Sequence, residues 1–134
     1  MAKPSADPRP ISPHLQVWKF HPTMVSSILH RASGVVNAIG LVLVSIWLIV
    51  LASGADAYAG MQAFLSGPIG VLVKLALAGF TLSLVYHFLN GIRHLAWDLG
   101  LGFDAKGSNQ RSMIIFIASI TLTAVIWLFC LEIV

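Results

Sequence analysis

The sequence predicts an all-α membrane protein with three transmembrane helices. Hydrophobic residues make up 57% of its 134 residues and charged residues only 10%. Soluble domains carry about 25% charged residues, so this composition is typical of a protein that lies in a bilayer. Three long apolar runs are each close to or above the roughly 20 residues that are needed to cross a bilayer core. Polar stretches separate these runs.

The first span is expected at about residues 22–52. Pro22 suits the first turn of a helix, and residues 32–55 contain no charged side chain. The preceding residues 1–21 form an N-terminal segment outside the membrane, because four prolines prevent a regular helix there. The membrane domain therefore covers residues 22–134.

The other two spans are expected at about residues 68–98 and 111–133. Ser and Gly residues border a connection at residues 53–68, within which residues 58–65 are compatible with a short surface helix. A polar, glycine-bearing loop at residues 99–111 joins the second and third spans.

The lysines and arginines predict the orientation of the chain. They gather in the N-terminal segment with the start of the first span, and around the second loop, whereas the first loop has none. By the positive-inside rule, the N-terminus and the second loop face the inner side of the membrane. The N-terminus shows no Arg- and Ser-rich amphipathic transit segment, which favours a bacterial inner membrane over a mitochondrial one.

Composition also excludes several classes of function. The eight Lys and Arg residues are scattered, so no basic face for nucleic acid is predicted. A single cysteine, Cys130, excludes an internal disulfide and the paired-cysteine attachment of c-type haem.

Residues 86–100 (YHFLNGIRHLAWDLG) carry an unusual concentration of polar groups at the end of an apolar run. On a helix, His87, Gly91, His94 and Asp98 would share one stripe, and Tyr86, Asn90, Arg93 and Trp97 the adjacent one. A charge at the centre of a membrane helix costs about 2.5–3.5 kcal/mol on insertion scales, so such groups indicate a functional site.

The predicted topology brings two sets of polar residues to the inner side. Ser27, His30 and Arg31 begin the first span, and Arg93, His94 and Asp98 end the second. His87 precedes Asp98 by eleven residues, so it lies roughly 16 Å deeper than Asp98 along the helix, near the middle of the bilayer.

A histidine at that depth suits an axial haem ligand, a His–Arg pair suits haem propionates, and Ser and Arg one turn apart suit a quinone carbonyl. A second chain is then required if the haem iron takes two axial ligands. The same residues are also compatible with simpler roles. His87 can bond a neighbouring helix, His94 can be solvated at the interface, and Asp98 can cap the loop or pair with Arg93.

Two motifs resemble a known family, the cytochrome b large membrane-anchor subunit of succinate dehydrogenase in respiratory complex II. Three spans and an inner N-terminus also fit that family, and the similarity covers nearly the whole chain. The matching residues are Arg9, Pro10, Ile11, Leu15, Pro22, residues 27–33 (SILHRAS) and residues 87–100 (HFLNGIRHLAWDLG).

This resemblance implies a helical bundle formed with a second, smaller anchor subunit, and a haem b shared with it. His87 matches the axial ligand of the haem iron, His30 and Arg31 match residues near the haem propionates, and Ser27 and Arg31 match the quinone-binding residues. Arg93, His94 and Asp98 are expected to support these groups.

The family further implies a flavoprotein subunit, an iron–sulfur subunit, surrounding membrane lipid and ubiquinone as electron acceptor. Succinate is oxidised in another subunit, so this chain has no catalytic residue of its own. Two alternatives stay open: the anchor of a quinol:fumarate reductase, and a non-redox membrane scaffold whose polar residues only bind partner helices.

Overall fold

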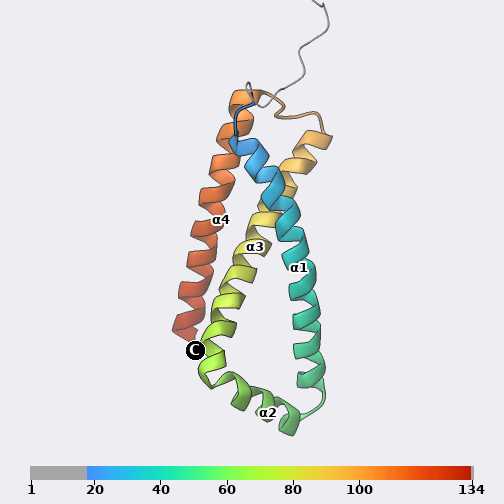
Figure 1. Ribbon diagram of the computed structural model, residues 1–134, viewed down its shortest axis with the longest axis vertical. Helices are drawn as coiled ribbons and strands as arrows, with labels where there is room; N and C mark the ends of the chain where they lie inside the picture. Colours follow the sequence, from blue (N-terminus) through green and yellow to red (C-terminus); the bar gives the residue numbers. More distant parts are fainter. Residues whose placement is uncertain (1–17, 134) are drawn as a thin grey trace, which may run out of the picture.

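The computed structural model describes residues 18–133 and contains four α-helices in that range. Three are long: α1 (Pro22–Ala52), α3 (Pro68–Asp98) and α4 (Ala105–Ile133). The short α2 (Ala55–Leu65) connects α1 to α3 and lies across one end of the molecule (Figure 1). All three long helices are long and apolar enough to cross a membrane, which confirms the predicted all-α membrane fold. Of the predicted segment 1–21, residues 1–17 lie outside the described part of the chain.

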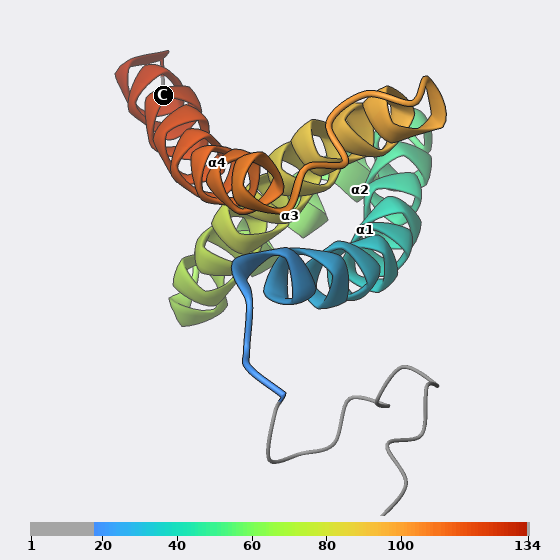
Figure 2. The same ribbon diagram turned by 90° about the horizontal axis from the view of Figure 1, so that it is seen from above.

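Helix α3 is the central element, because it packs against both α1 and α4 (Figures 1 and 2). At 1.5 Å per residue, its 31 residues span about 46 Å, which exceeds a hydrocarbon core of roughly 30 Å. The ends of the long helices therefore tilt or project into the headgroup region. The start of α1, the end of α3 and the start of α4 meet at the same end of the molecule (Figure 1).

Proline and glycine define the ends of α3. Pro68 opens the helix, where its missing N–H would have had no partner. At the other end, the Gly100 N–H donates to the Trp97 carbonyl and the Leu101 N–H donates to the Ala96 carbonyl, at 2.8 and 3.0 Å. These two bonds form a Schellman motif, which requires a left-handed residue, and Gly100 supplies it with φ = 78°. The chain therefore turns sharply toward α4.

Helix α4 begins earlier than the expected third span, at Ala105 and not near residue 111, so much of the expected loop 99–111 is helical. The cause is an N-cap: a side-chain oxygen of Asp104 accepts a hydrogen bond from the Gly107 N–H at 2.7 Å. Asp104 also accepts from Arg111 at 2.9 Å, and these two bonds hold the pKa of its carboxyl below the ordinary value. These contacts stabilise the first turns of α4, which precede the apolar part of the helix.

The molecule is polar inside and apolar outside. Among the described residues, Tyr86 is the only large hydrophobic side chain that is buried, whereas Leu, Ile, Val and Phe cover the outer faces. Lipid tails are as apolar as leucine, so burial of apolar surface does not drive helix association in a bilayer; close packing and hydrogen bonds do. The buried polar residues are Ser26, Ser33, Asn90, Arg93, Ser108, Ser112 and Ser119.

Close packing between α1 and α3 depends on Gly40. A Cβ atom at this position would overlap the ring of Phe80 on α3. The aromatic ring therefore occupies the space that the missing side chain leaves, and the two helix backbones approach each other there.

We expect Gly40→Ala to destabilise the folded protein by about 1–3 kcal/mol, because the added methyl group forces Phe80 or the helix backbone to move. Gly79→Ala on α3 is the matched control, since a Cβ there meets no atom within 4 Å. Thermal denaturation of the purified protein in detergent measures both variants. Equal melting temperatures for the two would contradict this account of the α1–α3 contact.

Candidate functional site

A buried guanidinium group joins the three long helices at the end where the two sequence motifs meet. The Nη1 of Arg93 on α3 donates to Ser26 Oγ on α1 at 2.9 Å and to Asn90 Oδ1 at 3.2 Å, and its Nη2 donates to Ser108 Oγ on α4 at 3.1 Å. The Ser26 hydroxyl donates to Asn90 Oδ1 at 2.9 Å. The Tyr86 hydroxyl donates to the Ser26 backbone carbonyl at 2.7 Å. We call these five residues the three-helix junction.

Arg93 is only 6% exposed, and no carboxylate pairs with it among the described residues. The face of Trp97 lies 4.3 Å from its guanidinium carbon, a cation–π geometry that further stabilises the charge. The hydroxyl and amide oxygens of the junction supply the remaining compensation, because a desolvated charge needs close hydrogen-bond acceptors.

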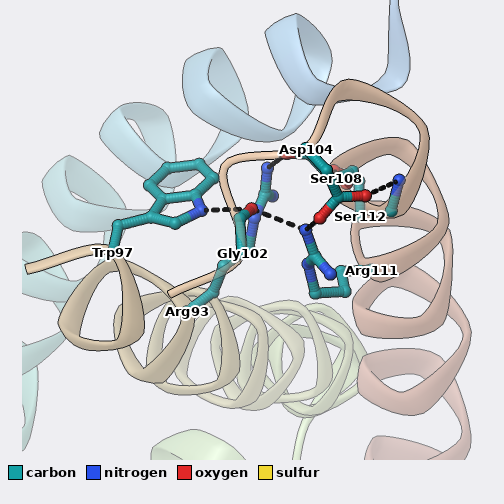
Figure 3. A network of polar contacts seen from close by, with 8 residues as sticks. Arg93, Trp97, Gly102, Asp104, Ser108, Arg111 and Ser112 are labelled. Atoms are coloured by element: carbon teal, nitrogen blue, oxygen red, sulfur yellow. Dashed lines mark hydrogen bonds and ion pairs between the residues drawn. The ribbon is translucent and has the colours of Figure 1, made fainter. Parts of the chain in front are cut away.

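The loop between α3 and α4 is fastened to the same place. Figure 3 shows the Trp97 Nε1 and the Arg111 guanidinium both directed at the Gly102 carbonyl oxygen. Gly102 has φ = 82°, a conformation that glycine adopts without strain. Arg111 also pairs with Asp104, so the loop is held from both helices.

Three histidines lie in a row between α1 and α3, in the order His87, His30, His94. The His30 ring on α1 stacks on the His87 ring with centroids 4.0 Å apart and planes 17° apart. The His94 ring is 5.0 Å from His30 and meets the edge of Trp97. Helices α1 and α3 therefore bring the three histidines together, and His87, which was expected deeper in the membrane than His30, stacks directly on it. No group of three or more His, Cys, Asp or Glu residues in the described chain is arranged to hold a metal ion.

The surroundings of His87 fix its tautomer. Its Nδ1 lies 3.1 Å from the backbone carbonyl oxygen of His30 and 3.0 Å from Ser33 Oγ. The Ser33 hydroxyl itself donates to the same carbonyl at 2.8 Å. Because a bare nitrogen would repel that carbonyl oxygen, the hydrogen belongs on Nδ1 and the Nε2 lone pair is left free. Gly34 allows the close approach, since a Cβ there would lie 3.3 Å from the imidazole.

Ser27 and Arg31 lie on the outward face of α1, one turn apart, and both are exposed. The Arg31 Nε contacts the Ser27 carbonyl at 3.4 Å. The structure thus places the two predicted quinone-binding residues together on the surface of this chain, and neither lines the cavity between α3 and α4 or the pocket beside His21 and Asn109. Any site that uses them is completed by atoms of another molecule.

The residues predicted to support the site differ in their roles. Arg93 is the centre of the three-helix junction, and His94 belongs to the histidine row. Asp98 is exposed at the end of α3, and its side chain makes no hydrogen bond to the described residues. Helical spacing predicts the shared stripe of Tyr86, Asn90, Arg93 and Trp97, but nothing in the sequence points to Ser26 and Ser108 as partners of Arg93.

By fold, the chain is a multi-pass α-helical membrane protein, and comparison with known proteins narrows the class. The profile of the family described as "Succinate dehydrogenase/Fumarate reductase transmembrane subunit" matches residues 5–126. The chain belongs to this family. The resemblance predicted from residues 27–33 and 87–100 is therefore confirmed.

Named relatives agree with the family. The succinate dehydrogenase cytochrome b556 subunit of Rickettsia prowazekii is 35% identical over 119 residues, which cover 89% of this chain and 90% of the relative. The subunit of the same name from Paracoccus denitrificans is 31% identical over 122 residues, 91% and 92% of the two chains. The mitochondrial cytochrome b560 subunit of Sus scrofa is 31% identical over 113 residues, 84% of this chain and 66% of the relative.

We expect Ser26→Ala to lower the stability of the folded protein by about 1–3 kcal/mol, because Arg93, Asn90 and Tyr86 each lose a buried partner. Ser27→Ala changes the next residue, which is exposed, and should leave stability within about 0.5 kcal/mol of the wild type. The melting temperatures of the two variants, measured side by side in detergent, check the assignment. The reverse order of stabilities would show that Ser27 carries the helix contact.

Proposed function

We propose that this chain is the membrane anchor of a succinate dehydrogenase that holds haem b through His87 and contributes Ser27 and Arg31 to a ubiquinone-reduction site. The family and the printed names of the relatives support the anchor role. The observation that carries the haem assignment is the free Nε2 of His87, whose Nδ1 is held by His30 and Ser33.

The residues present fit a haem with one axial ligand from this chain. Metal-bound histidines commonly donate their other ring N–H to a backbone carbonyl, which orients the ring and raises the basicity of the ligating nitrogen; His87 has that arrangement. When bound, the haem would supply a one-electron carrier within the bilayer. A second axial ligand would come from the smaller anchor subunit, as the family resemblance implies.

His30 and Arg31 are well placed to bind the propionates of such a haem. The His30 Nδ1 is buried and has no hydrogen-bond partner among the described residues. It is therefore available to hydrogen-bond a bound group. Arg31 follows on the exposed face of the same turn and offers a planar fork of N–H donors that suits a carboxylate. His94 adds a third polar ring against His30 at the inner end of the row.

Ser27 and Arg31 are suited to hydrogen-bond a quinone carbonyl. One hydroxyl and one guanidinium offer donors that strengthen as negative charge develops on the carbonyl oxygen, and a site closed to water strengthens them further. Their exposure in this chain indicates that the smaller anchor and the iron–sulfur subunit would complete the pocket, while a flavoprotein subunit would oxidise succinate.

The distribution of Lys and Arg supports an inner-side position for the junction, the N-terminus and the α3–α4 loop. The bacterial relatives and the three membrane-crossing helices support a bacterial inner membrane. The family description also includes fumarate reductases, so the direction of electron flow rests on the succinate dehydrogenase names of the relatives.

We expect His87→Leu to abolish the low-spin b-type haem spectrum of the purified complex, because it removes the free imidazole nitrogen while leucine preserves the helix. His21→Leu is a matched control, since it makes the same substitution at an exposed histidine that precedes α1 and lies outside the histidine row. The reduced-minus-oxidised optical spectrum is the measurement. A complex that keeps the wild-type spectrum in His87→Leu would refute the assignment, and a wild-type complex without any haem band would favour the non-redox scaffold.

We expect Ser27→Ala and Arg31→Leu to lower succinate–ubiquinone activity by roughly tenfold to a hundredfold, because each removes a donor to a group that gains charge. Electron transfer from succinate to a soluble acceptor should persist, since it leaves from the hydrophilic subunits. The ratio of the two activities in the same membranes is the measurement. A parallel fall of both would assign these residues to assembly, and no fall in either would place the quinone elsewhere.

A further inference from the structure

A cavity of about 430 Å³ lies between α3 and α4 at the end that carries the three-helix junction. Its walls are mostly apolar, with Leu89 and Ile92 from α3 and Ile114 and Ile115 from α4. Arg93, Trp97 and Arg111 also line it, and they belong to the polar end of the same two helices. One cavity thus joins an apolar groove to two cationic side chains.

The cavity is separate from the proposed haem and quinone site. At 3.6 residues per turn, Ala96, which lines the cavity, lies about 180° around α3 from His87. None of the three histidines, nor Ser27 or Arg31, lines it. Its occupant is therefore neither the haem nor the quinone proposed above.

Charge at the cavity is unbalanced. Asp104 pairs with Arg111, but no carboxylate pairs with Arg93 in the described chain, and neither Asp98 nor Asp104 lines the cavity. The Nε atoms of both arginines are buried without a hydrogen-bond partner among the described residues. Figure 3 shows Arg93 and Arg111 close to Gly102 in the loop between α3 and α4. Of the two arginines in the wall, only Arg111 is paired with a carboxylate, so the wall carries one uncompensated positive charge.

We propose that this cavity binds one anionic phospholipid, with an acyl chain along the apolar groove and the phosphate against Arg111. Arg111 is the accessible contact, because 39% of its side chain is exposed, and the buried Arg93 adds positive potential behind it. Basic pockets between transmembrane helices are suited to anionic headgroups, and Trp97 is a residue type that favours the headgroup level. A partner helix fits less well, because it would need a carboxylate at this depth to match the charge.

The test uses the intact, delipidated complex and native mass spectrometry with phosphatidylglycerol or phosphatidylcholine. Arg111→Gln should weaken phosphatidylglycerol binding at one site by roughly tenfold or more, because it removes a charge-assisted contact. Lys106→Gln is the matched control, since Lys106 lies five residues earlier on α4, is exposed and does not line the cavity. It removes the same charge and should leave binding unchanged.

A second variant addresses the groove without altering any charge. Ala96→Leu should fill part of the cavity and also weaken phosphatidylglycerol binding, while the α3–α4 loop keeps its contacts. Unaltered phosphatidylglycerol binding in both Arg111→Gln and Ala96→Leu would overturn the proposal. So would equal affinity for phosphatidylcholine, or release of the lipid by inorganic phosphate alone.

A photo-reactive residue at Ile92 separates lipid from protein as the occupant. We expect a cross-link to phospholipid in membranes, because Ile92 lines the apolar part of the cavity. A cross-link to another subunit would replace the lipid by a partner helix and refute the proposal. Because the haem spectrum depends on the opposite face of α3, failure here leaves the proposed function untouched, and the two failures are distinguishable.

Discussion

The buried positive charge of Arg93 is the constraint on which the arrangement of the three long helices depends. A guanidinium group removed from water must find acceptors, and here they come from α1, from its own helix and from α4. Each acceptor is a short side chain, so the helices have to approach closely at this end. Farther along the helices, α1 and α3 are held by close packing of the Phe80 ring against Gly40 and not by hydrogen bonds to Arg93. The junction thus determines the position of α1 relative to α3, and with it the stacking of His30 on His87.

The distribution of polarity explains how one chain can serve as both scaffold and binding surface. Polar groups that hold the helices together are buried within the chain, whereas Ser27 and Arg31 are left on its surface. His87 is intermediate: its Nδ1 is used inside the chain, and its Nε2 remains available. The chain therefore commits only some of its polar atoms to its own fold. The others suit a molecule that binds from outside.

Much of the fold could be predicted from the sequence, because a bilayer allows few solutions for three apolar runs of such length. The 3.6-residue period also placed His87 and His94 on one stripe and Asn90 and Arg93 on the next. The start of α4 could not be predicted in the same way. It depends on a single cap by Asp104, and the local composition, rich in Gly and polar residues, also suits a loop.

The pairing of residues across helices was likewise beyond the sequence. Ser26 and Ser27 are identical in chemistry and adjacent, and only the rotation of α1 decides which of them meets Arg93. Ser108 was expected in a loop, so its contact with Arg93 on α3 had no basis before α4 was known to start at Ala105. Periodicity gives the faces of each helix, but the facing partners depend on how the helices dock.

Because Ser26 and Ser27 are adjacent but face different ways, the first turns of α1 are sensitive to a shift in helical register. A residue inserted between Pro22 and Ser26 leaves the two serines docked as they are and only lengthens the entry. A residue inserted just after Ser27 instead turns His30, Arg31 and Ser33 by about 100° relative to the junction. The imidazole stack and the carbonyl that orients His87 would then face different neighbours, although composition and hydropathy would hardly change. The spacing between Ser26 and Ser33 is thus a tighter requirement on this protein than the length or apolarity of the span that contains it.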